Sequence, residues 1–190
     1  MSVAASAYFQ PDDLMPSPRY VSNNIVAFTG SNLEIRHLEL NWGNGRVNAP
    51  TGGGNVDSIF ANNEFGINIY NGIFGQTFGG QDSGQARIQD AGSGEYDLEM
   101  LQLNFTAGPY KLRESPTLAS TGHTTLTPTT GGYNVSSFFD IFFDISIDGG
   151  SSWIPSTSPV HLVGETPEPA SFVAIFAGLA GFGLKRKKKS

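Results

Sequence analysis

The stretch Phe138-Phe-Asp-Ile-Phe-Phe-Asp-Ile-Ser-Ile147 alternates apolar and polar side chains over most of its length. Successive side chains of a β-strand point to opposite faces, so this alternation predicts a strand with one apolar face. The apolar face comprises Phe139, Ile141, Phe143, Ile145 and Ile147. The opposite face includes Asp140, Asp144 and Ser146. We therefore expect one face to pack on a core and the other to meet water.

Further segments show the same period of two. They are residues 24–29, 33–42, 66–74 and 96–105. Within the second segment the apolar parity shifts between Ile35 and Leu38, and within the last it shifts at Met100 and Leu101. Because a one-residue slip moves side chains to the other face of a sheet, these shifts predict β-bulges or bends.

The composition favours short strands joined by tight turns, with 24 glycines, 11 prolines and 14 phenylalanines among 190 residues. We expect a single all-β domain with the architecture of a β-sandwich, of which a jelly roll is one form. We expect this body to span residues 8–154, with an exposed loop at 115–132 and a linker at 155–166.

The charge is strongly segregated along the chain. Residues 1–166 carry six basic and sixteen acidic side chains, a net charge of −10, whereas five basic residues lie within 185–189. Because such an acidic body would repel phosphates, we do not expect nucleic acid as a partner. The chain has no cysteine, which excludes disulfides, thiolate metal sites and cysteine nucleophiles.

Residues 170–184 form an uncharged segment that contains a single hydroxyl group, so a helix here would lack a polar face. Fifteen residues at 1.5 Å each span roughly 22 Å, less than the ~30 Å hydrocarbon core of a membrane. Pro169 in the first helical turn and the long basic side chains beyond would still permit a short span. We therefore predict one short C-terminal transmembrane helix. Its membrane residues are Ala170, Phe172, Val173, Ile175, Phe176, Leu179, Phe182 and Leu184.

A basic anchor follows the helix and consists of Lys185, Arg186, Lys187, Lys188 and Lys189. By the positive-inside rule it would hold the C-terminus in the cytoplasm and place residues 1–166 outside. Pro167, Glu168 and Pro169 stand immediately before the helix. This order of Pro-Glu-Pro, hydrophobic span and basic cluster resembles the PEP-CTERM sorting signal of exopolysaccharide-producing Gram-negative bacteria.

The resemblance is limited to residues 167–190. The domain of the family that they resemble is also known as an ice-binding-protein C-terminal domain. The resemblance implies that an exosortase, a membrane transpeptidase-like protease, removes the tail and releases or attaches the body outside the cell. The implied partners are the exosortase and the inner membrane during sorting, and exopolysaccharide is a candidate partner of the mature body. The implied destination is the cell surface or the extracellular matrix.

The N-terminus carries a partial export signal. Ala5, Ser6 and Ala7 have the small-x-small pattern of a signal-peptidase site, but no charged region or apolar run precedes them. We expect residues 1–7 to be the remnant of a signal-peptide cleavage region, with the true start of translation further upstream. The alternative is an ordinary N-terminus rich in small residues.

Ser146, Asp148, Gly150 and Trp153 resemble the Asp-box, Ser-x-Asp-x-Gly-x-x-Trp, of sialidase-like β proteins. In such a box the aspartate accepts backbone hydrogen bonds, the glycine supplies a positive φ and the tryptophan packs over the turn. Propellers repeat the box in every blade, whereas this chain has one copy. We predict a structural turn without glycosidase chemistry.

Other residues offer weaker signals of chemistry. Asp140, Asp144 and Asp148 suggest calcium, but four residues along a strand span ~13 Å and Ca²⁺ ligands lie about 2.3–2.6 Å from the ion. We therefore favour a solvated acidic face, and we expect no metal and no cofactor. The histidines, His37, His123 and His161, are isolated and fit no zinc motif. The aromatic residues Trp42, Tyr70 and Tyr110 are candidates either for stacking on sugars or for the core.

These observations predict a non-enzymatic exported protein with a β-sandwich body, associated with the cell surface or matrix. One alternative is a secreted carbohydrate-active enzyme with the same sorting tail. A second is a single-span membrane protein whose tail is never cleaved.

Overall fold

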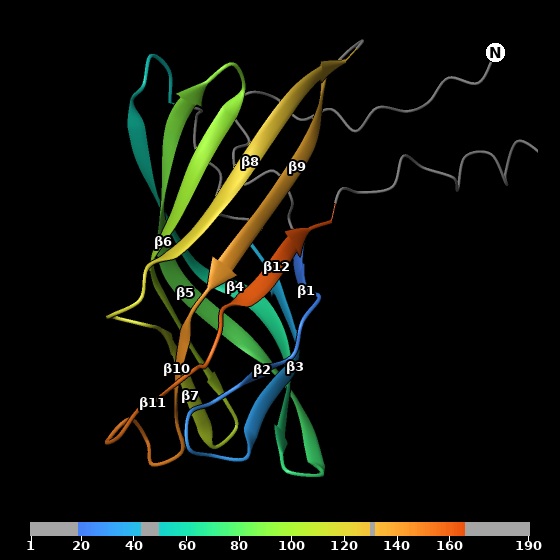
Figure 1. Ribbon diagram of the computed structural model, residues 1–190, viewed down its shortest axis with the longest axis vertical. Helices are drawn as coiled ribbons and strands as arrows, with labels where there is room; N and C mark the ends of the chain where they lie inside the picture. The colour runs from blue at the N-terminus through green and yellow to red at the C-terminus, as the bar shows by residue number, and fades with distance from the viewer. Residues whose placement is uncertain (1–18, 43–49, 130–131, 166–190) are drawn as a thin grey trace, which may run out of the picture.

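The computed structural model describes residues 19–42, 50–129 and 132–165, and these residues form an all-β fold (Figure 1). Every pairing between its strands is antiparallel. The strands are β1 (Arg19–Ser22), β2 (Val26–Ala27), β3 (Leu33–Asn41), β4 (Asn55–Asn71), β5 (Phe74–Gly92), β6 (Glu95–Ala107), β7 (Tyr110–Glu114), β8 (Ser120–Thr129), β9 (Gly132–Ile141), β10 (Phe143–Ser146), β11 (Ile154–Pro155) and β12 (Val160–Gly164).

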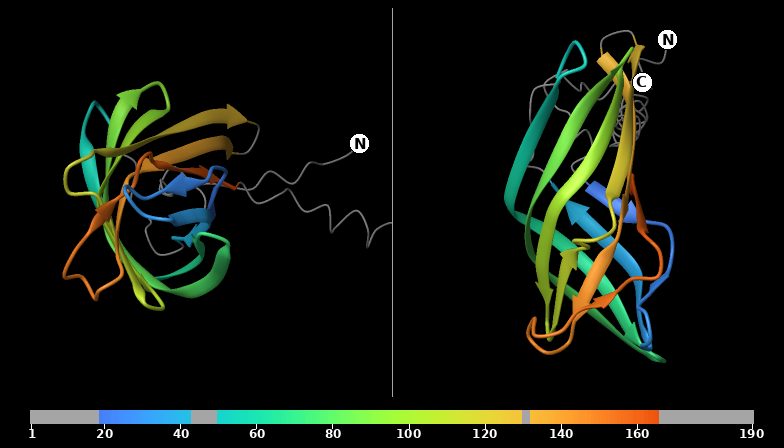
Figure 2. Two further views of the ribbon diagram at one scale, coloured as in Figure 1. Left: turned by 60° about the horizontal axis from the view of Figure 1, so that its bottom comes forward. Right: turned by 60° about the vertical axis from the view of Figure 1, so that its left-hand side comes forward.

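Eight of the strands close into a barrel in the order β6-β5-β4-β3-β1-β12-β9-β8, and β8 then pairs with β6. The additional strands extend this barrel at one end, with β7 on β6, β10 on β7, β11 on β10 and β2 on β3. A single bridge between Phe28 and Ser156 connects the chain after β2 to the chain after β11. Figure 2 shows the resulting ring of strands from its end and from its side.

The closed barrel replaces the β-sandwich that the sequence predicted. Alternating apolar residues show that one face of each strand is buried, but two facing sheets and one closed sheet bury that face equally well. The ladder that decides between them joins β6 to β8, from Glu95 opposite Thr125 to Met100 opposite Ser120. This pairing depends on the global curvature of the sheet, which no local pattern encodes.

The two predicted irregularities are confirmed as β-bulges. The β3–β4 register shifts between Ile35 and His37. The β5–β6 register shifts where Gln85 pairs with Gln102 and Ala86 pairs with Met100, so Leu101 is the additional residue.

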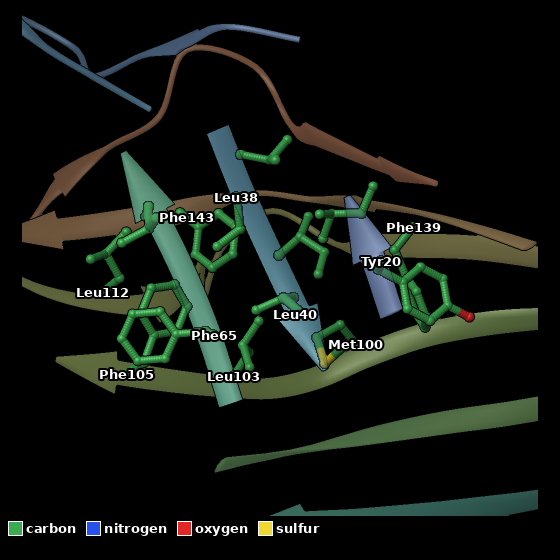
Figure 3. Packing of buried hydrophobic residues seen from close by; sticks show 14 of the residues in the cluster. Tyr20, Leu38, Leu40, Phe65, Met100, Leu103, Phe105, Leu112, Phe139 and Phe143 are labelled. Carbon is green, nitrogen blue, oxygen red and sulfur yellow. The ribbon is translucent and has the colours of Figure 1, made fainter. Parts of the chain in front are cut away.

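The barrel interior is filled by side chains (Figure 3). Four of the five residues predicted on the apolar face of 138–147 are fully buried, namely Phe139, Ile141, Phe143 and Ile145. The fifth, Ile147, is 57% exposed because β10 ends at Ser146 and a turn begins. Rings from β4 and β6, which flank β5, meet in the core, with Phe65 and Phe105 4.6 Å apart between ring centroids.

Two segments predicted as irregular are strands of the barrel. Residues 115–132 contain β8, and residues 155–166 contain β12, in which Val160 and Leu162 are fully buried. Threonine and valine favour strands, and this preference outweighs the proline and glycine that suggested a loop and a linker. The barrel therefore extends beyond the predicted end of the body at residue 154.

Several predictions fall outside the described residues. They concern the signal remnant at 1–7, the Pro-Glu-Pro motif, the hydrophobic helix and the basic anchor within 167–190. Within the described ranges no helix has the length and hydrophobicity needed to cross a membrane.

Candidate functional site

The sheet forks where β6 changes its partner. Residues 95–100 of β6 pair with β8, whereas residues 104–107 pair with β7. The bulge at Leu101 lies between these two ladders, and residues 115–119 leave the sheet between β7 and β8. A hollow of about 340 Å³ opens there and is lined by Glu99, Met100, Leu101 and residues 114–119. We call it the fork hollow.

Glu114 is the half-buried carboxyl of the fork hollow. The Ser120 hydroxyl donates to Glu114 Oε1 over 3.1 Å, and the Phe142 amide in turn donates to Ser120 Oγ over 3.1 Å. Burial raises the pKa of Glu114 to about 7, and the negative charges of Asp144 and Glu99 act in the same direction. At neutral pH this carboxyl is therefore distributed between its protonated and ionised forms.

A second hollow of about 400 Å³ lies on the outer face of β5, β6 and β8. It shares Glu99 with the fork hollow and is otherwise lined by Arg87, Gln89, Asp97, Leu98, Thr121 and Gly122. Arg87 is held in place by Asp57, with 2.8 Å between Nε and Oδ1. The two hollows together present acids, one guanidinium and one amide on the outside of the barrel.

His123 lies between two carboxylates beside this outer hollow. Its Nδ1 is 3.0 Å from Asp97 Oδ1 and its Nε2 is 2.6 Å from Glu95 Oε2. The Thr125 hydroxyl also donates to Glu95, over 2.8 Å. The hydrogen bond to Glu95, with help from Asp97, raises the pKa of His123. With both ring nitrogens occupied, this histidine has no nitrogen left to accept a proton from a nucleophile.

The other histidines occupy separate positions. His161 Nδ1 is 2.6 Å from Asp140 Oδ1, and the ring lies 5.4 Å from that of Phe138 between centroids. His37 Nε2 is 4.0 Å from the nearest oxygen of Glu39. The fold therefore does not bring the three histidines into one site.

The predicted turn at 146–153 connects β10 to β11. Asp148 Oδ1 accepts the Ser152 amide over 2.9 Å, and Ser146 Oγ accepts the Gly150 amide over 2.8 Å. Gly150 has a φ of 99°, a conformation that suits glycine. Hydrogen bonds from Ser152 hold the pKa of Asp148 far below its usual range. The carboxylate of Asp148 is therefore engaged in hydrogen bonds within the turn.

Trp153, the last residue of the turn, packs against Arg113 of β7. The Arg113 guanidinium lies 4.0 Å from the centroid of its ring, and Arg113 also binds Asp144 over 3.0 Å. A third hollow, of about 620 Å³, opens beside this tryptophan. It is lined by Gln81, Ser83, Asn104, Phe105, Thr106, Lys111, Leu112 and Trp153.

The three aspartates considered for calcium have three different partners. Asp140 pairs with His161, Asp144 with Arg113, and Asp148 with the turn. Among the described residues, no three histidines or acids are grouped in a way that could hold a metal ion.

The candidate sugar-stacking aromatics also differ in position. Trp42 is fully buried in the core, which removes it from the surface. Tyr70 is half-buried and covered by Arg36, whose guanidinium carbon is 3.9 Å from the ring centroid. Tyr110 is half-buried against Phe78, with 5.7 Å between ring centroids.

The barrel interior holds an acid that the sequence reasoning missed. Asp82 is 2% exposed and lies opposite Asn63 in the β4–β5 ladder. Trp42 Nε1 donates to Asp82 Oδ2 over 3.0 Å, whereas Asp82 Oδ1 and Asn63 Nδ2 make no hydrogen bond with any described residue. Burial raises the pKa of Asp82 to about 7, although the hydrogen bond from Trp42 opposes this shift. The sequence contained a signal for this burial, because Asp82 is separated by even numbers of residues from the buried Ala86 and Ile88 and so lies on the same face of the strand.

One family model matches the chain, and it describes the PEP-CTERM protein-sorting motif at residues 165–187. This match confirms the resemblance found in the sequence, and it covers the Pro-Glu-Pro motif, the hydrophobic segment and the first basic residues. No curated protein and no solved structure shows significant similarity to the chain. The motif therefore indicates where the protein is sent. The role of the barrel has to be inferred from the residues of the barrel itself.

Proposed function

We propose that this chain is an exported protein that an exosortase processes at the C-terminal PEP-CTERM motif, with the barrel as a non-enzymatic module at the cell surface or in the extracellular matrix. The precursor is inserted in the inner membrane through residues 170–184 and keeps its basic anchor in the cytoplasm. The observation that carries this proposal is the match of residues 165–187 to the protein-sorting motif.

The last strand of the barrel ends close to this motif in the sequence. β12 ends at Gly164, and the Glu165 amide donates to the Arg19 carbonyl over 2.9 Å. Arg19 also binds the carboxylates of Glu165 and Glu39. Two residues lie between Gly164 and Pro167, so at most roughly 11 Å of chain separates the barrel from the motif. The barrel would therefore remain close to the exosortase during processing.

The chemistry of the outer hollows supports a binding role. His123 is engaged by two carboxylates, and Asp148 is engaged by its own turn. Neither is arranged as a general base beside a nucleophile. Arg87, Gln89 and Asp97 line one hollow with planar polar groups that can pair with neighbouring hydroxyls. We propose that the barrel associates with hydroxyl-rich exopolysaccharide through this hollow.

Processing is tested by substitution within the motif. Full-length protein is expressed in its host as Glu168→Gln, with Glu64→Gln, an exposed position outside residues 165–187, as the matched control. We expect Glu168→Gln to leave the tail attached, and the control to be processed like the original chain. A host without exosortase should retain the tail in every variant. Equal tail removal in both variants and in that host would overturn the proposal.

The fork hollow favours one second candidate function, a carbohydrate-active enzyme. Glu114, with a pKa of about 7, and Glu99 line the same hollow, as a general acid and its partner carboxylate would. Turnover of polysaccharide by the full chain that is lost in Glu114→Gln and kept in Glu95→Gln would support this candidate. Absence of turnover in the original chain would exclude it for the polysaccharides assayed.

A further inference from the structure

The hollow beside Trp153 has no part in the functions considered above. Strands β7, β10 and β11 pair side by side at the lower end of the barrel, and the turn at 146–153 joins β10 to β11 (Figure 1). Residues of β5, β6 and β7 line the hollow together with Trp153 of this turn. Its volume of about 620 Å³ lies within the range of about 300–1,000 Å³ of small-molecule sites. We call it the Trp153 hollow.

Neutral polar side chains from two neighbouring strands line the Trp153 hollow. Gln81 and Ser83 come from β5, and Asn104 and Thr106 come from β6. Ser83 lies opposite Asn104 in the ladder, so the side chains of the two strands meet on the outer face of the sheet. Within the described ranges, none of these four side chains hydrogen-bonds to another residue. Their amide and hydroxyl groups can therefore donate to a ligand and accept from it.

Lys111 brings one positive charge to the Trp153 hollow. Its Nζ donates to the Gly149 carbonyl over 2.7 Å, and no described carboxylate lies within 4.0 Å of it. Asp148 of the same turn is engaged by Ser152. The arginines of the described ranges each pair with a carboxylate, as Arg19 with Glu39, Arg36 with Glu34, Arg87 with Asp57 and Arg113 with Asp144. Lys111 is therefore the one described lysine or arginine whose charge no carboxylate neutralises.

The indole of Trp153 lies beside this ammonium group. Lys111 Nζ and Trp153 Cζ2 are each 3.7 Å from the point that a Cβ on Gly150 would occupy. Arg113 lies 4.0 Å from the indole centroid and is itself held by Asp144, so the ring is fixed in place before a ligand arrives. Sugar rings pack their C–H groups against aromatic rings of this kind. The Trp153 hollow therefore combines an aromatic surface, one cation and neutral hydrogen-bonding groups.

We propose that the Trp153 hollow binds an acidic sugar, a hexuronate residue of a polysaccharide, with its carboxylate on Lys111 and its ring against Trp153. A hexuronate carries its carboxylate on a carbon that is bonded to the ring, so one residue can reach both groups. The amides and hydroxyls of β5 and β6 then bind the ring hydroxyls. Hydrogen bonds to ionised groups are about twice as strong as neutral ones, so Lys111 selects an acidic sugar over a neutral one.

This site is distinct from the outer hollow on β5, β6 and β8. There Asp97 and Glu99 would repel a carboxylate, and Arg87 is already paired with Asp57. The inference about the Trp153 hollow therefore depends neither on sugar binding at the outer hollow nor on removal of the tail.

Calorimetric titration of the full-length chain with trigalacturonate tests the site. The matched probe is the methyl ester of the same trisaccharide, in which the carboxyl groups carry no charge. We expect the ester to bind about tenfold more weakly at low ionic strength. Added salt should weaken binding of the acid and leave binding of the ester unchanged, because salt screens charges near the surface.

Substitutions assign the charge contact to one side chain. Lys111→Gln should bind trigalacturonate about tenfold more weakly than the original chain, whereas Lys111→Arg keeps a cation and should restore most of the affinity. Arg87→Gln is the control, because it changes the net charge equally but lies in the outer hollow, and its affinity should equal that of the original chain. Lys111 is exposed, so its variants should fold, and circular dichroism verifies this.

Several results would overturn the proposal. Absence of trigalacturonate binding by the original chain at about 10 mM would do so, as would equal affinities for the acid and its ester. Equal binding by Lys111→Gln and the original chain would place the contact elsewhere. An equal loss in Lys111→Gln and Arg87→Gln would show that overall charge, and not this hollow, attracts the ligand.

Discussion

Replacement of Asp82 by asparagine should stabilise the barrel at pH 8 and change its stability little at pH 4.5. Asp82 is buried, and within the described part of the chain only Trp42 donates a hydrogen bond of normal geometry to it. Asparagine keeps the size of the side chain and an oxygen that accepts the Trp42 N–H, but it cannot ionise. The substitution therefore removes the cost of a buried negative charge and little else.

The size of the effect follows from the pKa of Asp82, which burial raises from 3.8 to about 7. A folded-state pKa above the unfolded value means that the folded protein binds the proton more tightly. The free energy of unfolding therefore falls as pH rises from about 4 to about 7 and is constant above that range. At about 1.4 kcal/mol per pKa unit the full shift is worth roughly 4 kcal/mol, and relaxation around the charge reduces this to on the order of 2 kcal/mol.

The assay is thermal and urea unfolding of both proteins between pH 4.5 and pH 8.5. For a domain of this size, 2 kcal/mol corresponds to a rise in Tm of about 4–8 °C at pH 8. Glu114→Gln is the control, because Glu114 also has a pKa of about 7 but is only half-buried. If the original protein and Asp82→Asn lose stability in parallel over pH 4.5–8, Asp82 is not the group that titrates.

Gly122→Ala should destabilise the barrel by about 1–3 kcal/mol in urea unfolding, because the new Cβ would lie 2.2 Å from the Phe138 carbonyl oxygen. Gly66→Ala should have little effect, because no atom lies within 4 Å of the new Cβ. Asp148→Ala should lower Tm by removing the acceptor of the Ser152 amide, and a Tm equal to that of the original protein would contradict this role for the turn. His123→Gln should lower Tm near pH 5.5 but not at pH 9. The raised pKa of His123 stabilises the fold at low pH, and this contribution is lost as pH rises through the folded-state pKa. An equal fall in Tm at both pH values would show that packing dominates.

The sequence predicted local features of the barrel well and its closure poorly. The alternation at Phe139 and Ile141 identified a core face, and the parity slip at Leu101 identified a bulge. Both depend on the period of the strand, which is a local property. The β6–β8 ladder joins residues about twenty or more positions apart, and the same patterns would suit a sandwich. Long-range pairing therefore had to come from the structure.

The candidate sites show the same division. The residues of the turn at 146–153 are close in sequence, so a short motif located them. His123 and Glu95 meet across two strands, and the fork hollow depends on where β6 changes its partner. The buried Asp82 lies in a Gly-rich strand that the sequence analysis did not identify. Its parity with Ala86 and Ile88 could have assigned it to the interior.

The measurement that tests the central claim most directly is mass spectrometry of the protein recovered from its native host, with both mature termini read. Processing by an exosortase predicts a protein that lacks the residues beyond Pro169, and the predicted signal-peptidase site places its N-terminus near Tyr8. Recovery of a chain that retains both Met1 and Ser190 would contradict the sorting account.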